Sequence, residues 1–151
     1  MNRLYIILTF ILIITFPEYS LSQSCKYFYK INCAHDENSL YKIHEKSINK
    51  KSVTGQVTQI EMEIFYGRDY KIIICGDEVF GNIFDFKIKD IENNIMYDNA
   101  NDNYSSSFEF SALESKNIII EVVVPDTNEG YKAKGCLGIL IEYKLSVKTG
   151  F

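Results

Sequence analysis

The sequence has no tryptophan and only two histidines, and it lacks the short motifs on which common enzyme mechanisms depend. Nucleophile elbows of the form G-x-S-x-G, zinc-protease H-E-x-x-H motifs and glycine-rich phosphate loops are all absent. His35 and His44 are the only side chains whose ordinary pKa suits proton transfer near neutral pH, and both lie in an N-terminal part without a regular pattern. We therefore expect no enzyme activity, no catalytic residue and no cofactor.

Closely spaced metal ligands and basic clusters are also lacking. No C-x₂₋₄-C pair occurs, and Cys33-Ala34-His35 is the nearest approach to a zinc-binding spacing, so we do not expect a metal site. The chain has 16 basic and 20 acidic residues, which gives a net charge of −4. Because these charges are spread along the chain without a basic stripe, we expect no nucleic-acid partner.

The first residues have the features of a signal peptide. Arg3 provides a positive start, and residues 4–16 form an uncharged, almost wholly apolar run of 13 residues. Ser20 and Ser22 fit the small-x-small rule for signal peptidase, so cleavage is expected before Gln23. The apolar run is shorter than the roughly 20 residues of a spanning helix. We predict a signal peptide over 1–22, a secreted or periplasmic mature chain, and no stable membrane span after cleavage. An uncleaved anchor and a lipid-modified Cys25 are the alternatives.

All four cysteines follow the predicted cleavage site. An even number of cysteines in an exported chain favours disulfides over free thiols. Three connectivities are possible, and sequence alone does not choose among them. Placement favours a local Cys25–Cys33 bond and a long-range Cys75–Cys136 bond, because Cys75 ends one apolar run and Cys136 begins another.

From residue 52 onward the hydrophobic pattern indicates β-strands. Apolar and polar residues alternate over Val57–Ile64 and Phe84–Lys89, whereas Ile118–Val124 is a nearly continuous apolar run. Helical crossovers of the kind that parallel sheets need are missing. We predict an all-β fold, an antiparallel β-sandwich (jelly-roll or Ig-like) of about seven or eight strands. A short irregular, disulfide-stapled N-terminal segment over 23–50 packs on the sandwich domain of 51–151.

Residues from about 70 to 145 resemble the bacterial pre-peptidase C-terminal domain, a small exported β-sandwich. The matching elements are Tyr70–Ile74, Phe84–Ile88, Met96–Asn99, Phe108–Phe110 and Asn117–Val124, with Leu137–Ile141 as the closing strand. The sequence departs from the family where Ser115-Lys116-Asn117 replaces its usual Gly-Thr-Tyr. The resemblance implies a non-catalytic exported sandwich, without implying a particular ligand.

Four features are candidates for a functional role. The run Asp98–Asn103 offers oxygen ligands for calcium, although Asp and Asn also favour turns. Glu121 interrupts the apolar run, where it either faces water on an edge or pairs with a lysine, or else has a raised pKa and a role. Tyr97, Tyr104 and Tyr131 lie in or beside polar loops, where an exposed ring can stack on a sugar or fill a partner's pocket, unless the rings pack over the ends of the sandwich. Asn103-Tyr104-Ser105 is also a glycosylation sequon.

Three functional hypotheses follow. The first is an exported, non-catalytic binding or interaction module that contacts an unknown protein or glycan partner outside the cell or at its envelope. The second is a glycan-binding module that uses tyrosine and asparagine side chains of the 97–104 and 126–135 loops. The third is a small secreted hydrolase with dispersed carboxylates, which the missing motifs make the weakest.

Overall fold

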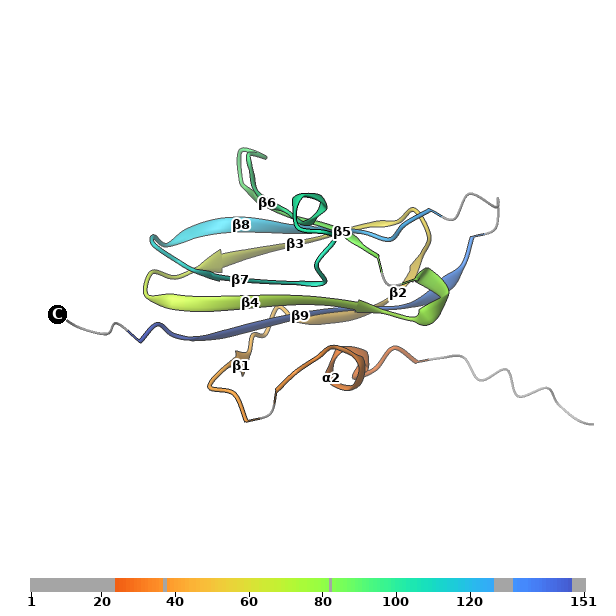
Figure 1. Cartoon of the computed structure of the whole chain (residues 1–151), viewed down its shortest axis with the longest axis horizontal. Coiled ribbons are helices and arrows are strands. Elements are labelled where there is room, and N and C mark those ends of the chain that lie inside the picture. The colour runs from red at the N-terminus through yellow and green to blue at the C-terminus, as the bar shows by residue number, and fades with distance from the viewer. Residues whose placement is uncertain (1–23, 37, 82, 127–131, 148–151) are drawn as a thin grey trace, which may run out of the picture.

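In the computed structural model two antiparallel sheets face each other (Figure 1). The structure describes residues 24–36, 38–81, 83–126 and 132–147. The predicted signal peptide, residues 1–22, lies outside the described residues. Antiparallel strands prevail, as the alternating pattern predicts, and the two-sheet sandwich is confirmed.

The first sheet is built around the longest strand of the described chain, β9, whose residues are buried from Gly135 to Glu142. Its strand order is β1-β9-β4-β7. Strand β2 also pairs with β9 directly, along a different stretch of β9 from β1. The strands are β1 (Lys42–Ile43), β2 (Ile48–Val53), β4 (Arg68–Gly76), β7 (Ser107–Ser111) and β9 (Lys134–Leu145).

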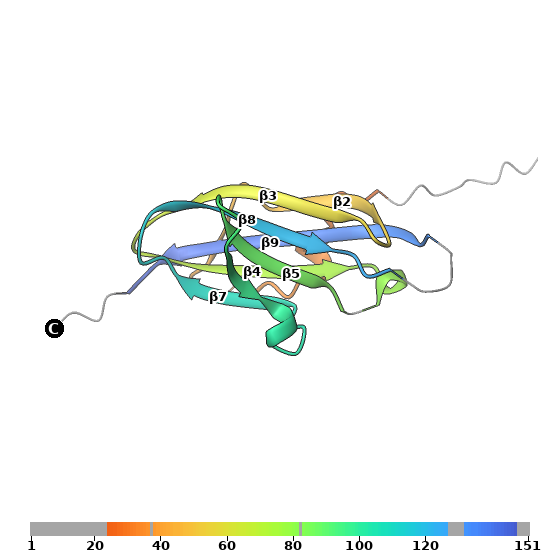
Figure 2. The same cartoon turned by 90° about the horizontal axis from the view of Figure 1, so that it is seen from above.

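The second sheet has the order β3-β8-β5-β6. Its strands are β3 (Val57–Ile64), β5 (Asp85–Asp90), β6 (Ile95–Asp98) and β8 (Lys116–Val123), seen from above in Figure 2. Short 3₁₀ turns, η1 (Glu78–Phe80) and η2 (Asn99–Asn101), follow β4 and β6. Strand β7 is an edge strand of the first sheet, and β6 is an edge strand of the second. The side of the sandwich on which these two edges lie is called the free side below.

The core lies between the sheets and is formed by one face of each strand. In β3, residues alternate strictly between exposed and buried, with Ile60, Met62 and Ile64 facing inward. Tyr70 and Phe86 are fully buried on facing sheets. Burying a large apolar side chain stabilises the fold by about 1.5–3 kcal/mol, so this alternation drives the pairing of the sheets.

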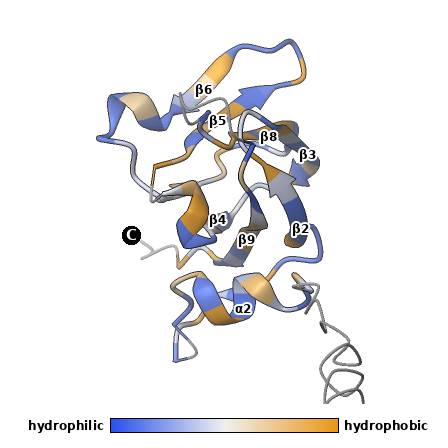
Figure 3. Ribbon diagram, turned by 90° about the vertical axis from the view of Figure 1, so that its right-hand side faces the viewer, coloured by the Kyte–Doolittle hydropathy of each residue, from blue (hydrophilic) through white to orange (hydrophobic). Residues whose placement is uncertain are grey.

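Before β1, the N-terminal segment covers the outer face of the first sheet, whereas its residues Lys42–Ile43 and 48–50 are part of that sheet. It contains one short helix, α2 (Phe28–Asn32), which lies against β9 (Figures 1 and 3). Outward-facing Ile73 and Leu140 are buried beneath the segment. Gly138 permits this close approach, because a Cβ there would lie 2.8 Å from Cys75 Sγ and 3.1 Å from Tyr29 Cβ. Among the described residues, no helix is long and apolar enough to cross a membrane.

Two disulfides fasten the segment, but their pairing differs from the one that placement favours. Cys25 bonds Cys136 and Cys33 bonds Cys75, so the expected Cys25–Cys33 and Cys75–Cys136 pairs are wrong. Helix α2 separates Cys25 from Cys33 along the segment. Cys75 lies opposite Gly138 in the β4–β9 register, not opposite Cys136. Each end of the segment therefore reaches a different cysteine of the sheet, and both bonds are typical of an oxidising compartment outside the cytosol.

Candidate functional site

The predicted calcium ligands serve the turn in which they lie. Asp98 Oδ1 accepts a hydrogen bond from the Ala100 amide at 3.0 Å, and its Oδ2 lies 3.1 Å from Lys87 Nζ. Asn99 is 1% exposed, and its side chain bonds the backbone of Phe84 and Phe86 before the turn and of Ser105 after it. Asp102 Oδ2 accepts from the Tyr97 hydroxyl at 3.0 Å. Within the described part of the chain, no group of three or more His, Cys, Asp or Glu residues is placed to hold a metal ion.

Two of the three candidate tyrosines, Tyr97 and Tyr104, lie among the described residues and have different surroundings. Tyr97 stacks on Phe108 with ring centroids 3.7 Å apart, and burial together with Asp102 raises its pKa to about 12. Tyr104 is 44% exposed and belongs to the turn after η2, where Asn103 of the sequon is also exposed. Tyr131 and the preceding residues 127–130 of the second candidate loop lie outside the described residues.

The remaining sequence candidates have structural partners. Glu121 binds Lys89 at 2.7 Å and Gln59 at 2.7 Å, so the expectation of a lysine partner is confirmed. Hydrogen bonds from Lys89 and Gln59 hold the pKa of Glu121 below its ordinary value. His35 Nδ1 lies 2.5 Å from the buried Glu142 carboxylate. Burial lowers the pKa of His44, which packs edge-on against Tyr143.

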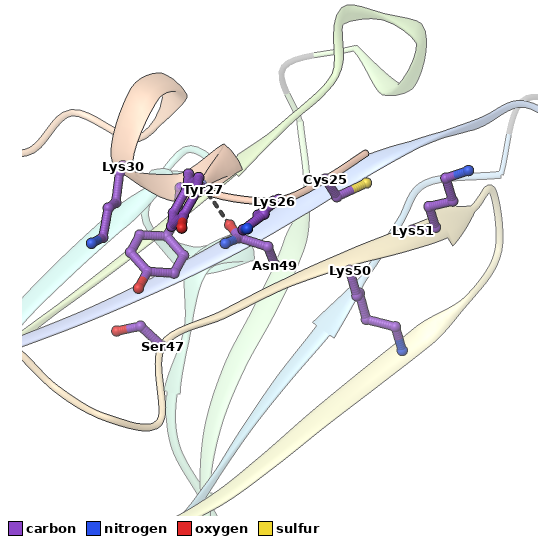
Figure 4. Close-up of a pocket in the computed structure, with 9 residues that line it drawn as sticks. Cys25, Lys26, Tyr27, Lys30, Ser47, Asn49, Lys50 and Lys51 are labelled. Carbon is purple, nitrogen blue, oxygen red and sulfur yellow. Dashed lines mark hydrogen bonds between the residues drawn. The ribbon is translucent and has the colours of Figure 1, made fainter. Parts of the chain in front are cut away.

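A pocket of about 460 Å³ lies between the N-terminal segment and β2, and the sequence interpretation missed it. Figure 4 shows Lys26, Tyr27 and Lys30 on the helix side. Ser47 and Asn49 lie across from them, at the start of β2. Lys50 and Lys51, from the same strand, also line the pocket and extend in opposite directions, with Lys50 pointing away from the helix (Figure 4). Cys25 and Tyr29 complete the lining.

Local structure fixes this pocket on both sides. Tyr27 has φ of 64°, an uncommon conformation for a bulky residue, and it precedes helix α2 directly. Asn49 Oδ1 accepts a hydrogen bond from the Tyr29 amide at 2.6 Å, which ties the helix to β2. The disulfides of Cys25 and Cys33 hold the two ends of the helical segment on the sheet. The pocket wall is therefore anchored covalently.

Three of the four lysines that line the pocket have no carboxylate partner among the described residues. Lys26 and Lys30 lie 5.1 and 5.6 Å from the centre of the Tyr27 ring. In the described ranges, no carboxylate lies within ion-pair distance of Lys26, Lys30 or Lys50. Asn49 Nδ2 likewise has no acceptor among the described residues. The pocket thus presents cationic and amide donors around an aromatic ring.

The signal for this site is a local charge excess. Residues 24–53 contain six lysines and three acidic residues, whereas residues 54–151 contain nine basic and sixteen acidic residues. The even spread of charge expected from the whole chain is therefore wrong for the N-terminal segment. Lys26 and Lys30 are about twenty residues from Lys50 and Lys51 in sequence, and only the packing of α2 on the sheet brings them to one pocket.

Comparison with protein-family models and with curated proteins found no match. The resemblance to the pre-peptidase C-terminal domain therefore stays a prediction, and the fold and the pocket carry the functional argument.

Proposed function

We propose that this chain is an exported, non-catalytic binding module that holds an anionic polysaccharide in the pocket between the N-terminal segment and β2. The observation that carries the proposal is the pair Lys26 and Lys30, held around Tyr27 without a neutralising carboxylate among the described residues. In a chain with a net charge of −4, such a local excess of positive charge favours a negatively charged ligand.

Each pocket residue has a role in this proposal. The lysine ammonium groups attract sulfate or carboxylate groups of the ligand. Tyr27 is 52% exposed, and its ring offers a face on which a sugar ring stacks. Asn49 Nδ2 donates a hydrogen bond to a hydroxyl or an acid oxygen. Because the pocket is open and its wall is fixed by two disulfides, a polymer passes across it without rearranging the fold.

Export is part of the proposal. The predicted signal peptide over 1–22 and the two disulfides both support a secreted or periplasmic protein. Polysaccharides with sulfate or uronic acid groups occur outside the cytosol, where such a module meets them. The missing catalytic motifs support a binding role without turnover.

Interferometry on immobilised dextran sulfate, carboxymethyl dextran and plain dextran tests the proposal at neutral pH. We expect binding to the two anionic polymers and none to plain dextran. The K26Q/K30Q variant should bind about tenfold more weakly or worse, because two charge-assisted contacts are lost. The matched K116Q/K132Q variant removes the same charge from exposed ion pairs elsewhere and should bind as the wild type does.

Three outcomes would contradict the proposal. They are equal binding to plain dextran, no binding to either anionic polymer, and an equal loss in the two charge variants. Tyr27→Ala and Tyr104→Ala separate the pocket from the loop tyrosines. A loss on Tyr104→Ala alone would move the glycan site to the turn after η2.

A further inference from the structure

An apolar groove of about 210 Å³ lies at the free side of the sandwich, and it shares no lining residue with the lysine pocket. Its lining comes from β5 and from the two edge strands β6 and β7: Ile88, Met96, Tyr97, Phe108, Phe110 and Ser111. The groove therefore lies where the two sheets are open to each other.

Half-buried aromatic rings form the floor of this groove. Tyr97 and Phe108 stack at 3.7 Å between ring centroids, and Phe108 and Phe110 stack at 5.7 Å. Met96 at its rim is 44% exposed, and the neighbouring Ile95 is 56% exposed. Aromatic and large apolar side chains that are left half-exposed together mark a contact surface more often than scattered single residues do.

Strand β7 also offers free backbone hydrogen-bonding groups. Ala112 donates to Arg68 and Ile74 donates to Ser106, so the residues of even number pair with β4. Because paired residues alternate in an antiparallel ladder, the backbone groups of Glu109 and Ser111 point away from β4. Ser107 is already bonded by the Ser105 hydroxyl. The open edge of β7 is therefore short and consists of the backbone groups of Glu109 and Ser111.

Charge around the groove is negative at both ends. Residues 91–115 contain five acidic residues and no lysine, arginine or histidine. Asp102 accepts from the Tyr97 hydroxyl at one end, and Asp69 accepts from Ser111 Oγ at 2.7 Å at the other. Asp69 and Glu109 share one lysine, Lys144, at 3.9 and 3.8 Å, so this end keeps an excess of one negative charge. Asp98 and Glu114 each have a lysine partner of their own, Lys87 and Lys116.

We propose that this groove binds an extended segment of a partner protein in which apolar and basic residues alternate, added as a strand beside β7. Apolar side chains of the segment enter the groove between β6 and β7, and its backbone bonds the free groups of Glu109 and Ser111. Its basic side chains meet Asp69 and Asp102. Alternating side chains on an added strand match this arrangement, because successive residues point to opposite faces.

Fluorescence anisotropy with three labelled nine-residue peptides tests the proposal. The probes are an alternating Lys/Val peptide, a Lys/Ser peptide without apolar side chains and a Glu/Val peptide. We expect the Lys/Val peptide to bind at least about tenfold more tightly than the other two. Met96→Lys places a charge in the groove and should abolish the preference, whereas Leu113→Lys, at an 84% exposed position off the groove, should not.

A backbone variant tests the added strand. Glu109→Pro removes an outward amide while the ladder to β4 is kept, and it should weaken Lys/Val binding without changing the far-UV spectrum. Equal binding of the Lys/Val and Lys/Ser peptides, or no effect of Met96→Lys, would overturn the proposal. Concentration-dependent dimers that Met96→Lys disrupts would assign the groove to a second copy instead. The K26Q/K30Q variant should bind the peptides normally, so this test is independent of the polysaccharide pocket.

Discussion

Asn99 is the buried polar side chain on which the turn after β6 depends. Its Oδ1 accepts from the Phe86 amide at 2.9 Å, and its Nδ2 donates to the Phe84 carbonyl at 2.7 Å and to the Ser105 carbonyl at 3.1 Å. Asn99→Ala leaves these backbone groups without partners, so we expect the free energy of unfolding to fall by about 2–3 kcal/mol. Urea denaturation measures the change. Asn101→Ala, in the same turn but exposed, is the control and should change stability little.

Glu142 and His35 form a contact beneath the N-terminal segment. Glu142 is 1% exposed, and its Oε1 lies 2.5 Å from His35 Nδ1. His35→Ala leaves the buried carboxylate without this partner, and we expect a loss of about 3 kcal/mol in the free energy of unfolding. The double variant His35→Ala/Glu142→Met removes the buried charge and should recover most of the loss. A double variant as unstable as the single one would show that the contact does not carry this energy.

Single residues were predictable only where their pattern was local. Glu121 in an apolar run indicates a lysine partner, and Lys89 provides it. In the sequence, Asn99 belongs to a run of possible calcium ligands, and nothing there reveals that its amide is buried against the backbone. Side chains that bond backbone far from them in sequence give no pattern that distinguishes them from surface asparagines.

At the scale of elements, the disulfides determine how α2 lies on the sheet. They close loops of 42 and 111 residues, and chain-entropy estimates give about 4–5 kcal/mol for each. A non-reducing peptide map should link the Cys33 peptide to the Cys75 peptide and the Cys25 peptide to the Cys136 peptide. The Cys33→Ser/Cys75→Ser variant should lower the free energy of unfolding by several kcal/mol, measured by urea denaturation. A map with Cys25 joined to Cys33 would contradict the fold of the segment.

On the outer face of the second sheet, Glu121 of β8 contacts Lys89 of β5 and Gln59 of β3. These contacts predict that acid lowers the stability of the fold. Lys89 and Gln59 lower the pKa of Glu121 in the folded state, so its stabilising contribution is complete above the unfolded pKa of about 4.5. The contribution is lost as the pH falls through the lower folded-state pKa. Glu121→Gln should therefore destabilise the protein at pH 7 and have a smaller effect at pH 3, measured by urea denaturation. An equal effect at both values would mean that charge is not the cause.

For the whole molecule, the architecture was predictable and the site was not. Period-2 patterns in β3 and β5 define the buried face of each strand without reference to the rest of the chain, so the sandwich follows from them. The pocket depends on which cysteines pair and on where α2 rests, and neither is encoded by a local period. Lys26 and Asn49 come together only after the sheet has formed, so the lysine excess over residues 24–53 marks this part of the chain without locating the pocket.

Charge distribution over the whole molecule leads to the last prediction. Residues 24–53 carry an excess of three positive charges while residues 54–151 carry an excess of seven negative ones, so a polyanion is attracted at one end and repelled elsewhere. Attraction in the pocket acts over a few ångströms and the repulsion acts over longer distances, where salt screens it first. The Debye length is about 10 Å at 0.1 M salt and about 3 Å at 1 M.

Affinity for dextran sulfate, measured from 0.05 to 1 M salt, should therefore change little at first and then fall steeply. The K116Q/K132Q variant should follow the same curve. The K26Q/K30Q variant should show a much flatter decline, because the contacts that salt competes with are gone. Affinity that rises throughout the series would mean that apolar contacts hold the polymer and that repulsion by the acidic body dominates. The lysines would then have no part in binding, and the proposed site would have to be abandoned.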